Sequence, residues 1–112
     1  MEKDVKLVKF DYILENVFKK YKNVYIFLKG ISLSQEYINI FEKNDIILNI
    51  FRFEDIPVEY KGLFDDWQTF MVFDDNSYCY QLKNDIFLLG LNNVKYTKTY
   101  NKGFDVLKQV LK

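Results

Sequence analysis

Histidine and alanine are both missing from this 112-residue chain, and cysteine, arginine and proline each occur once. Histidine is the side chain used most often for proton transfer, so Ser-His-Asp and Cys-His catalytic arrangements are excluded within the chain. One thiol and no imidazole also exclude a zinc site built from the usual cysteine and histidine ligands. The single Cys79 cannot form an internal disulfide, which is typical of a reducing compartment, so we expect a cytoplasmic protein.

Long apolar runs and glycine clusters are also missing. No stretch approaches the roughly 20 apolar residues that a membrane-spanning helix needs, so we expect no membrane partner. The four glycines are isolated from one another, and none belongs to a spaced cluster that could wrap a phosphate. From these absences we expect a protein that is not an enzyme and that holds no cofactor or metal.

Lysine, asparagine, isoleucine, phenylalanine and tyrosine are abundant, and all five have A/T-rich codons. We therefore expect an A+T-rich genome, such as that of a low-GC bacterium, its phage or another mobile element. Hydrophobic residues make up 49% of the chain and aromatic residues 19%, which indicates a globular protein rather than a disordered one. The length predicts a single globular domain over 1–112.

Hydrophobic spacing predicts the elements of the first half of the chain. A stripe of period 3.6 predicts a helix over 5–22, and a continuous apolar run predicts a strand over 24–28 that is buried on both faces. The capping-box pattern Ser32–Gln35 predicts a second helix, which stops near Asn44. A strand over 46–53 is then expected to pair in parallel with the first strand, because a helix separates the two.

The second half of the chain predicts a loop, a β-meander and a helix. Residues 54–66 predict a loop with one helical turn, because they contain a proline and a glycine. Asp, Asn and Ser clusters, which tolerate positive φ, separate four strand-like segments: 67–73, 78–82, 86–91 and 94–100. Asn101 is the predicted cap of a last helix. The predicted class is α+β: αβαβ, then an antiparallel β-meander and a C-terminal helix, in a mixed sheet with helices on at least one face.

Charge is distributed unevenly, although the formal total is zero. The net charge is +3 over residues 1–31, −7 over 32–94 and +4 over 95–112. Within 54–75, seven carboxylates face one lysine, and large aromatic side chains lie among them. Aromatic residues surrounded by complementary charge are typical of protein interfaces, so this segment is the predicted partner-binding surface. Its predicted contact residues are Glu59, Tyr60, Phe64, Asp65, Asp66, Trp67, Asp74 and Asp75.

An acidic, aromatic surface of this kind suits a basic protein partner, such as a toxin or a nuclease. Its carboxylates would stand in for phosphates and occupy lysine and arginine side chains that serve nucleic acid. The leading hypothesis is a small inhibitor, either an immunity protein that neutralises a toxin or a phage-encoded inhibitor of a host defence nuclease. Tyr60, Phe64 and Trp67 are its expected aromatic contacts.

A nucleic-acid-binding accessory protein is the first alternative. A strand over 94–100 would place Tyr96, Lys98 and Tyr100 on one face. Lys95 would lie on the other face. Tyrosine stacking beside lysine is typical of proteins that bind single-stranded nucleic acid. The near absence of arginine and the isoelectric point of about 6.3 weigh against this alternative.

A carboxylate-dependent enzyme is the second alternative. The pairs Asp65–Asp66 and Asp74–Asp75 could hold Mg²⁺ or act as general acid and base. Neighbouring residues of an extended segment point to opposite faces, however, so neither pair forms a shared site by itself. Cys79 lies within a predicted strand without an assignable base, and we expect it to be a small apolar filler.

Overall fold

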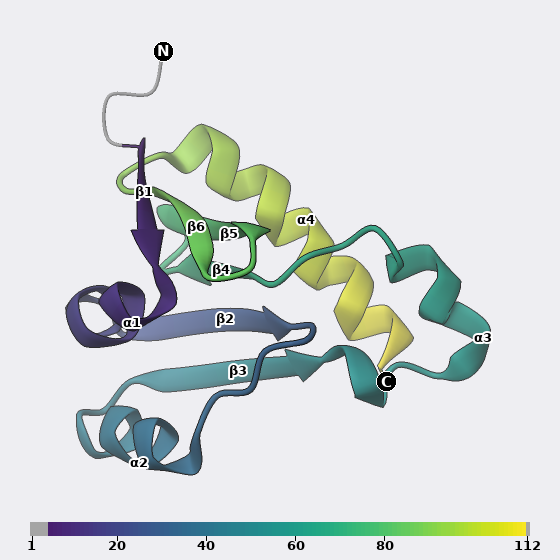
Figure 1. Cartoon of the computed structure of the whole chain (residues 1–112), viewed down its shortest axis with the longest axis horizontal. Helices are drawn as coiled ribbons and strands as arrows, with labels where there is room; N and C mark the ends of the chain where they lie inside the picture. The colour runs from purple at the N-terminus through teal and green to yellow at the C-terminus, as the bar shows by residue number, and fades with distance from the viewer. Residues whose placement is uncertain (1–4, 112) are drawn as a thin grey trace.

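The structure is a computed structural model that describes residues 5–111 of the chain, so the predicted domain over 1–112 is described except at its two ends. The strands are β1 Val5–Lys9, β2 Asn23–Leu28, β3 Ile47–Arg52, β4 Phe70–Phe73, β5 Ser77–Lys83 and β6 Ile86–Gly90. They form one sheet in the order β1-β6-β5-β4-β2-β3 (Figure 1). β2 and β3 are parallel, as predicted, and all other neighbours are antiparallel. The predicted α+β class with a mixed sheet is therefore confirmed.

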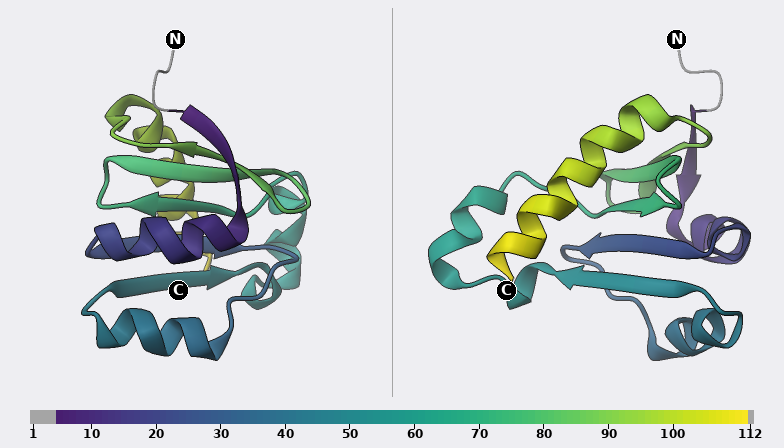
Figure 2. Two further views of the ribbon diagram at one scale, coloured as in Figure 1. Left: turned by 60° about the vertical axis from the view of Figure 1, so that its left-hand side comes forward. Right: turned by 180° about the vertical axis from the view of Figure 1, so that it is seen from behind.

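Helical segments cover both faces of this sheet. They are α1 Phe10–Tyr12, the π-helical turn η1 Ile13–Val17, the 3₁₀ turn η2 Phe18–Lys20, α2 Gln35–Lys43, the 3₁₀ turn η3 Phe53–Asp55, α3 Val58–Lys61, the 3₁₀ turn η4 Gly62–Phe64 and α4 Val94–Val110. The first three segments and α2 pack on one face, and α4 lies across the other (Figure 2). The C-terminal helix predicted from the sequence is thus present, on the face opposite to α2.

Two hydrophobic cores result, one on each face, and the central strands contribute to both. In β2, Val24, Ile26 and Leu28 point into the core under α2, whereas Tyr25 and Phe27 face the core under α4. β4 alternates in the same way, because side chains along a strand point to opposite faces in turn. Burial on both faces explains why these strands are continuous apolar runs in the sequence.

The helix predicted over 5–22 is wrong at its start, because Val5–Lys9 forms the edge strand β1. β1 pairs along its whole length with β6, which supplies partners for its backbone groups. The chain then turns into helical structure at Phe10, whose backbone N–H donates to Oδ1 of Asp85 at 3.2 Å. The predicted apolar stripe itself is correct, and its buried members are Ile13, Leu14, Val17 and Phe18.

The strand predicted over 94–100 and the cap predicted at Asn101 are also wrong. The 17-residue helix α4 already begins at Val94. Its cap is Asn93, whose Oδ1 accepts from the backbone N–H of Tyr96 at 3.1 Å. β-branched and aromatic residues favour strands only weakly, and burial of a helical face outweighs that preference here. The fully buried members of that face are Thr97, Phe104 and Leu107.

Shorter features agree more closely with the sequence. α2 ends at Asn44 as predicted, although its cap is Ser34 rather than Ser32, with Oγ accepting from the backbone N–H of Tyr37 at 3.4 Å. The predicted turn residues adopt positive φ, between 49° and 61°, at Asp74, Asp75, Asn84 and Asn92. Aspartate and asparagine tolerate this conformation better than other residues with a side chain.

Candidate partner-binding surface

Residues 53–67 project beyond the ends of the strands, at the right of Figure 1, and are called the 53–67 projection below. Instead of a loop with one helical turn, they form three consecutive short turns, η3, α3 and η4. Ile56 and Phe64 on its inner side are buried in the core under α4. The projection is therefore a packed part of the fold, with a defined inner and outer side.

Lys29, just after β2, ties the projection to the sheet. Its Nζ donates to the backbone carbonyl oxygens of Phe64, at 2.9 Å, and of Asp65, at 2.5 Å. The same ammonium group lies 4.9 Å from the centre of the Phe53 ring, and Nζ of Lys61 lies 5.2 Å from that ring. Cations over an aromatic face add a modest attraction. These contacts preorganise the projection, which reduces the entropy lost when a partner binds.

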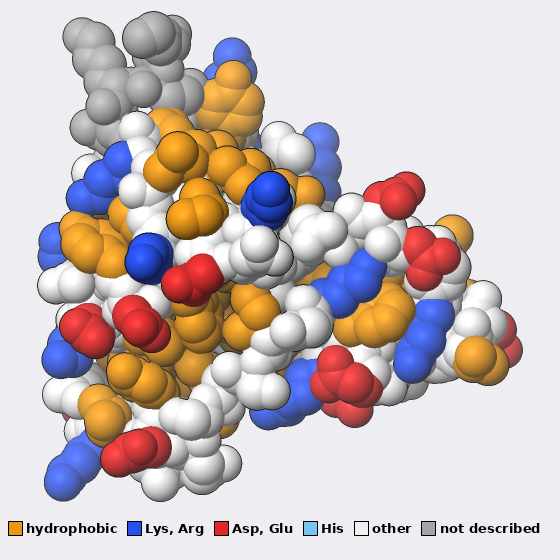
Figure 3. All heavy atoms as spheres, in the orientation of Figure 1, with side chains coloured by type: hydrophobic (Ala, Val, Ile, Leu, Met, Phe, Trp, Pro, Cys, Tyr) orange, Lys and Arg blue, Asp and Glu red, His pale blue; other side chains and the backbone are white. Residues whose placement is uncertain are grey.

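The outer side of the projection combines apolar and acidic side chains. Val58 is 86% exposed, Leu63 is 67% exposed and Tyr60 is 43% exposed. Exposed carboxylates surround them: Glu54, Asp55, Glu59, Asp65 and Asp66. Figure 3 shows charged side chains on this side of the molecule with apolar side chains exposed between them. Large apolar side chains exposed among charged ones are candidates for contact with another protein.

Among the aromatic contacts predicted from the sequence, only Tyr60 is freely accessible. Phe64 is fully buried, so its prediction as a contact residue is wrong. Its ring lies edge to face with Trp67, with centroids 4.6 Å apart, and Trp67 is itself half-buried. Val58 and Leu63 were not predicted, because turns this short give no periodicity from which an outer side can be read.

The predicted acidic residues do not all lie together. Asp74 and Asp75 follow β4, whereas Asp65 and Asp66 precede it, so an extended strand of about 3.3 Å per residue separates the two pairs. Asp74 is structural, because Oδ1 accepts from the backbone N–H of Asn23 at 2.8 Å. Oδ1 of Asp75 accepts from Nδ2 of Asn101 at 3.1 Å, which links the turn after β4 to α4. The candidate surface is therefore limited to the acids of the projection.

The lysine and tyrosine residues of the nucleic-acid alternative do not form the predicted strand face. In the helix α4, Lys98 is two residues from both Tyr96 and Tyr100 and lies on the other side of the helix axis. Tyr100 is half-buried and stacks on Tyr78, with centroids 4.8 Å apart. Burial raises the pKa of Tyr100 to about 12. The stacking platform that motivated this alternative is therefore not formed by these residues.

Cys79 is fully buried in the core under α2, where it packs as an apolar residue. Burial raises the pKa of its thiol far above the usual range, because a thiolate would be desolvated there. We expect no labelling by a thiol reagent such as iodoacetamide in the native protein, and full labelling in denaturant. Mass spectrometry of both samples measures the difference. Rapid labelling of the native protein would contradict the buried position.

Comparisons with protein-family models, with curated proteins and with solved structures find no match to this chain. Within residues 5–111, no three His, Cys, Asp or Glu side chains are grouped so as to hold a metal ion. Nor does any helix of that range combine the length and apolar character needed to cross a bilayer. A function for the chain therefore has to be argued from the chemistry of its surface.

Proposed function

We propose that this chain is a small non-enzymatic protein that binds a basic protein and blocks it through the 53–67 projection. The observation that carries the proposal is the exposure of Val58 and Leu63, 86% and 67%, on a projection whose inner side packs into the core under α4. Burial of apolar side chains of this size against a partner lowers the free energy of the complex. The projection carries five exposed carboxylates, whereas the two lysines nearby, Lys29 and Lys61, lie over the Phe53 ring. This excess of negative charge favours a partner with a cationic surface.

A nuclease or a nuclease toxin meets this description, because its nucleic-acid groove is lined by lysine and arginine. The carboxylates of the projection would occupy that groove in place of phosphates, while Tyr60, Val58 and Leu63 exclude water at the centre of the contact. Inhibition would then be steric and electrostatic and would need no chemical step. An immunity protein and a phage-encoded inhibitor of a defence nuclease would both act in this way.

The double substitution Val58→Ser/Leu63→Ser tests this proposal. Two apolar contacts of about 1.5–3 kcal/mol each would be lost, so we expect the affinity for the partner to fall about 100-fold or more. The partner is first captured from lysate of the source cells and identified by mass spectrometry, and its affinity is then measured with the purified proteins. Purified partner should also lose its activity at a one-to-one ratio with the wild-type chain.

The matched control is Val94→Ser/Val106→Ser, because these two valines of α4 are also exposed, at 51% and 44%, and lie outside the projection. Its affinity should equal that of the wild type. The charge-reversal variant Glu59→Lys/Asp65→Lys should mainly slow association and remove the salt dependence of the rate. Equal affinity of the Val58→Ser/Leu63→Ser variant and the control would refute the projection as the binding surface.

A further inference from the structure

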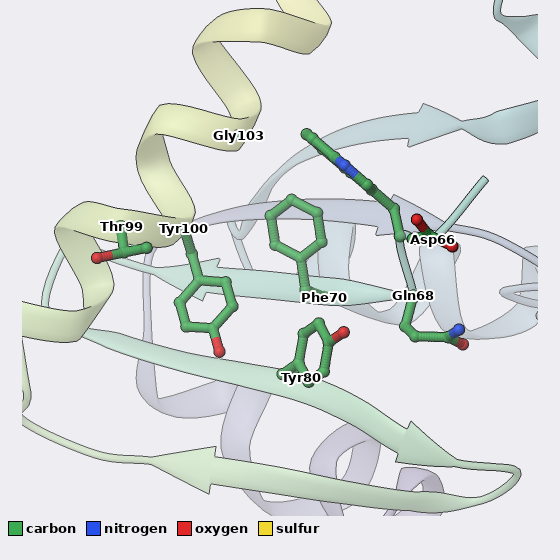
Figure 4. A pocket seen from close by; sticks show the side chains of 8 residues that line it. Asp66, Gln68, Phe70, Tyr80, Thr99, Tyr100 and Gly103 are labelled. Atoms are coloured by element: carbon green, nitrogen blue, oxygen red, sulfur yellow. The ribbon is translucent and has the colours of Figure 1, made fainter. Parts of the chain in front are cut away.

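A hollow of about 240 Å³ lies between α4 and the start of β4, on the face of the sheet opposite α2. Four aromatic residues line it: Trp67, Phe70, Tyr80 and Tyr100. Phe70 is buried and forms the floor, whereas the exposed Asp66 lies at the rim. Figure 4 shows the rings of Phe70, Tyr80 and Tyr100 between α4 and Asp66, which lie on opposite sides of the hollow. A dry cavity of about 150 Å³ accommodates benzene, so this hollow has room for a small organic group.

Gly103, in the middle of α4, lines the hollow where the helix passes close to two of its rings. A Cβ atom at this position would lie 3.1 Å from Cζ of Phe70 and 3.4 Å from Cη2 of Trp67. Glycine within a helix costs about 1 kcal/mol relative to alanine. The missing side chain therefore lets the helix pass close above the two rings at a local cost in helix stability.

The rings that line the hollow are inclined to one another. The planes of Trp67 and Phe70 meet at 63°, those of Phe70 and Tyr100 at 40°, and those of Tyr80 and Tyr100 at 39°. The corresponding centroids are 5.7, 5.7 and 5.8 Å apart. A flat base or ring system would need two parallel walls between which to stack. Rings this close together contact one another and form an uneven wall of the hollow, against which a rounded group such as a tetrahedral alkylammonium can pack.

The charge of the hollow selects the same kind of group. Aromatic faces carry a negative quadrupole, which attracts cations. Asp66 adds a carboxylate at the rim, and no described lysine or arginine lines the hollow to neutralise it. Tyr100 is uncharged at physiological pH, as an ordinary tyrosine is, and burial raises its pKa further, to about 12. A methylated ammonium loses less hydration than a bare ammonium on entering such a site, since its methyl groups are already apolar.

We propose that this hollow binds an alkylated ammonium group, carried by a choline-like metabolite or by a methylated lysine side chain. The proposal goes beyond the binding of a protein partner and does not depend on it. Trp67 is the only tryptophan of the chain, so its fluorescence reports on the hollow directly.

The first experiment titrates the purified chain with choline and with 3,3-dimethylbutan-1-ol at constant ionic strength. The two molecules have nearly the same shape, but a carbon atom replaces the charged nitrogen in the second. We expect saturable change in Trp67 fluorescence with choline and at least about tenfold weaker binding of the neutral analogue. Equal binding of the two, or no saturation below about 0.1 M choline, overturns the proposal.

Two substitutions and a matched control locate the site. Asp66→Asn should weaken choline binding about fivefold or more, because an exposed carboxylate at the rim is lost without disturbing the fold. Gly103→Leu should abolish binding by filling the hollow, provided that its unfolding curve confirms a folded protein. Asp65→Asn removes the neighbouring carboxylate, which does not line the hollow, and should bind choline as the wild type does. Unchanged binding by Asp66→Asn would contradict the assigned site.

The source of the ligand is distinguished by a peptide that carries trimethyllysine. The hollow is assigned to a methylated protein if this peptide binds at least tenfold more tightly than choline and at least tenfold more tightly than the same peptide without the methyl groups. Equal or tighter binding of choline assigns it to a free metabolite. Asp66 and Trp67 belong both to the hollow and to the 53–67 projection, but these titrations use the purified chain without a protein partner. Failure of the partner-binding proposal therefore leaves this test intact.

Discussion

Replacement of Phe104 by alanine is expected to lower the free energy of unfolding by about 3–5 kcal/mol. Phe104 is 1% exposed, and its ring lies 4.7 Å from that of Phe70, 5.5 Å from Tyr25 and 5.6 Å from Phe51, measured between centroids. Three strands therefore meet α4 at this side chain. Its removal leaves a cavity among rigid rings that cannot easily collapse.

Urea denaturation followed by circular dichroism measures the effect. Small domains have a total stability of about 5–15 kcal/mol, so the variant should be close to unfolding at moderate urea concentrations. Val106→Ala on the same helix is the matched control, because Val106 is 44% exposed and its loss should change stability by less than about 0.5 kcal/mol. Equal midpoints for the two variants would show that α4 does not stabilise the sheet through Phe104.

Gly90→Ala is expected to lower the free energy of unfolding by about 1–3 kcal/mol, or to displace a neighbouring ring. A Cβ atom at position 90 would overlap the ring of Tyr78 on the adjacent strand, with Oη only 2.8 Å away. Tyr78 is 3% exposed and stacks on Tyr100, so its ring cannot swing outward without breaking that stack. Because Tyr100 lines the aromatic hollow, choline binding should weaken together with stability.

Gly62→Ala serves as the control for this second substitution. Gly62 has φ of −59° and ψ of −27°, and an added Cβ atom meets nothing within 4 Å. Alanine fits this backbone and restricts the unfolded chain, so a gain of about 0.4–1 kcal/mol is expected. Thermal and urea unfolding of both variants gives the comparison. Equal stability of Gly90→Ala and Gly62→Ala would contradict this argument, because it would mean that the Tyr78 ring can move aside without cost.

The sequence predicts elements well where burial leaves a clear pattern. β2 and β4 are apolar throughout because both of their faces are covered, and α2 has a polar cap at each end. β1 could not be separated from the following helix, because it is an edge strand without regular alternation: Leu7 is 63% exposed whereas Val8 packs against a core. β1 is a strand because it pairs with β6, which lies far along the chain, with Val5 opposite Gly90. A local sequence pattern does not contain that information.

The candidate surface was predicted only in part, for the same reason. The acidic residues of 54–66 singled out from the sequence are exposed on the projection. The adjacent residues Leu63 and Phe64, however, differ completely, at 67% and 0% exposure. Only the tertiary position of η4 decides which of the two faces solvent. The aromatic hollow was not predicted at all, because its rings come from β4, β5, α4 and the segment before β4, which only the tertiary fold brings together.

The division of the interior into two cores has a consequence for how such a protein can change over evolutionary time. Phe70 and Met71 are adjacent in β4, but one packs under α4 and the other under α2. Substitutions at the two positions therefore need compensation in different helices, and drift on one face leaves the other undisturbed. The α4 face, which holds both the hollow and the base of the 53–67 projection, can therefore vary around its own core residues without matching changes on the α2 face.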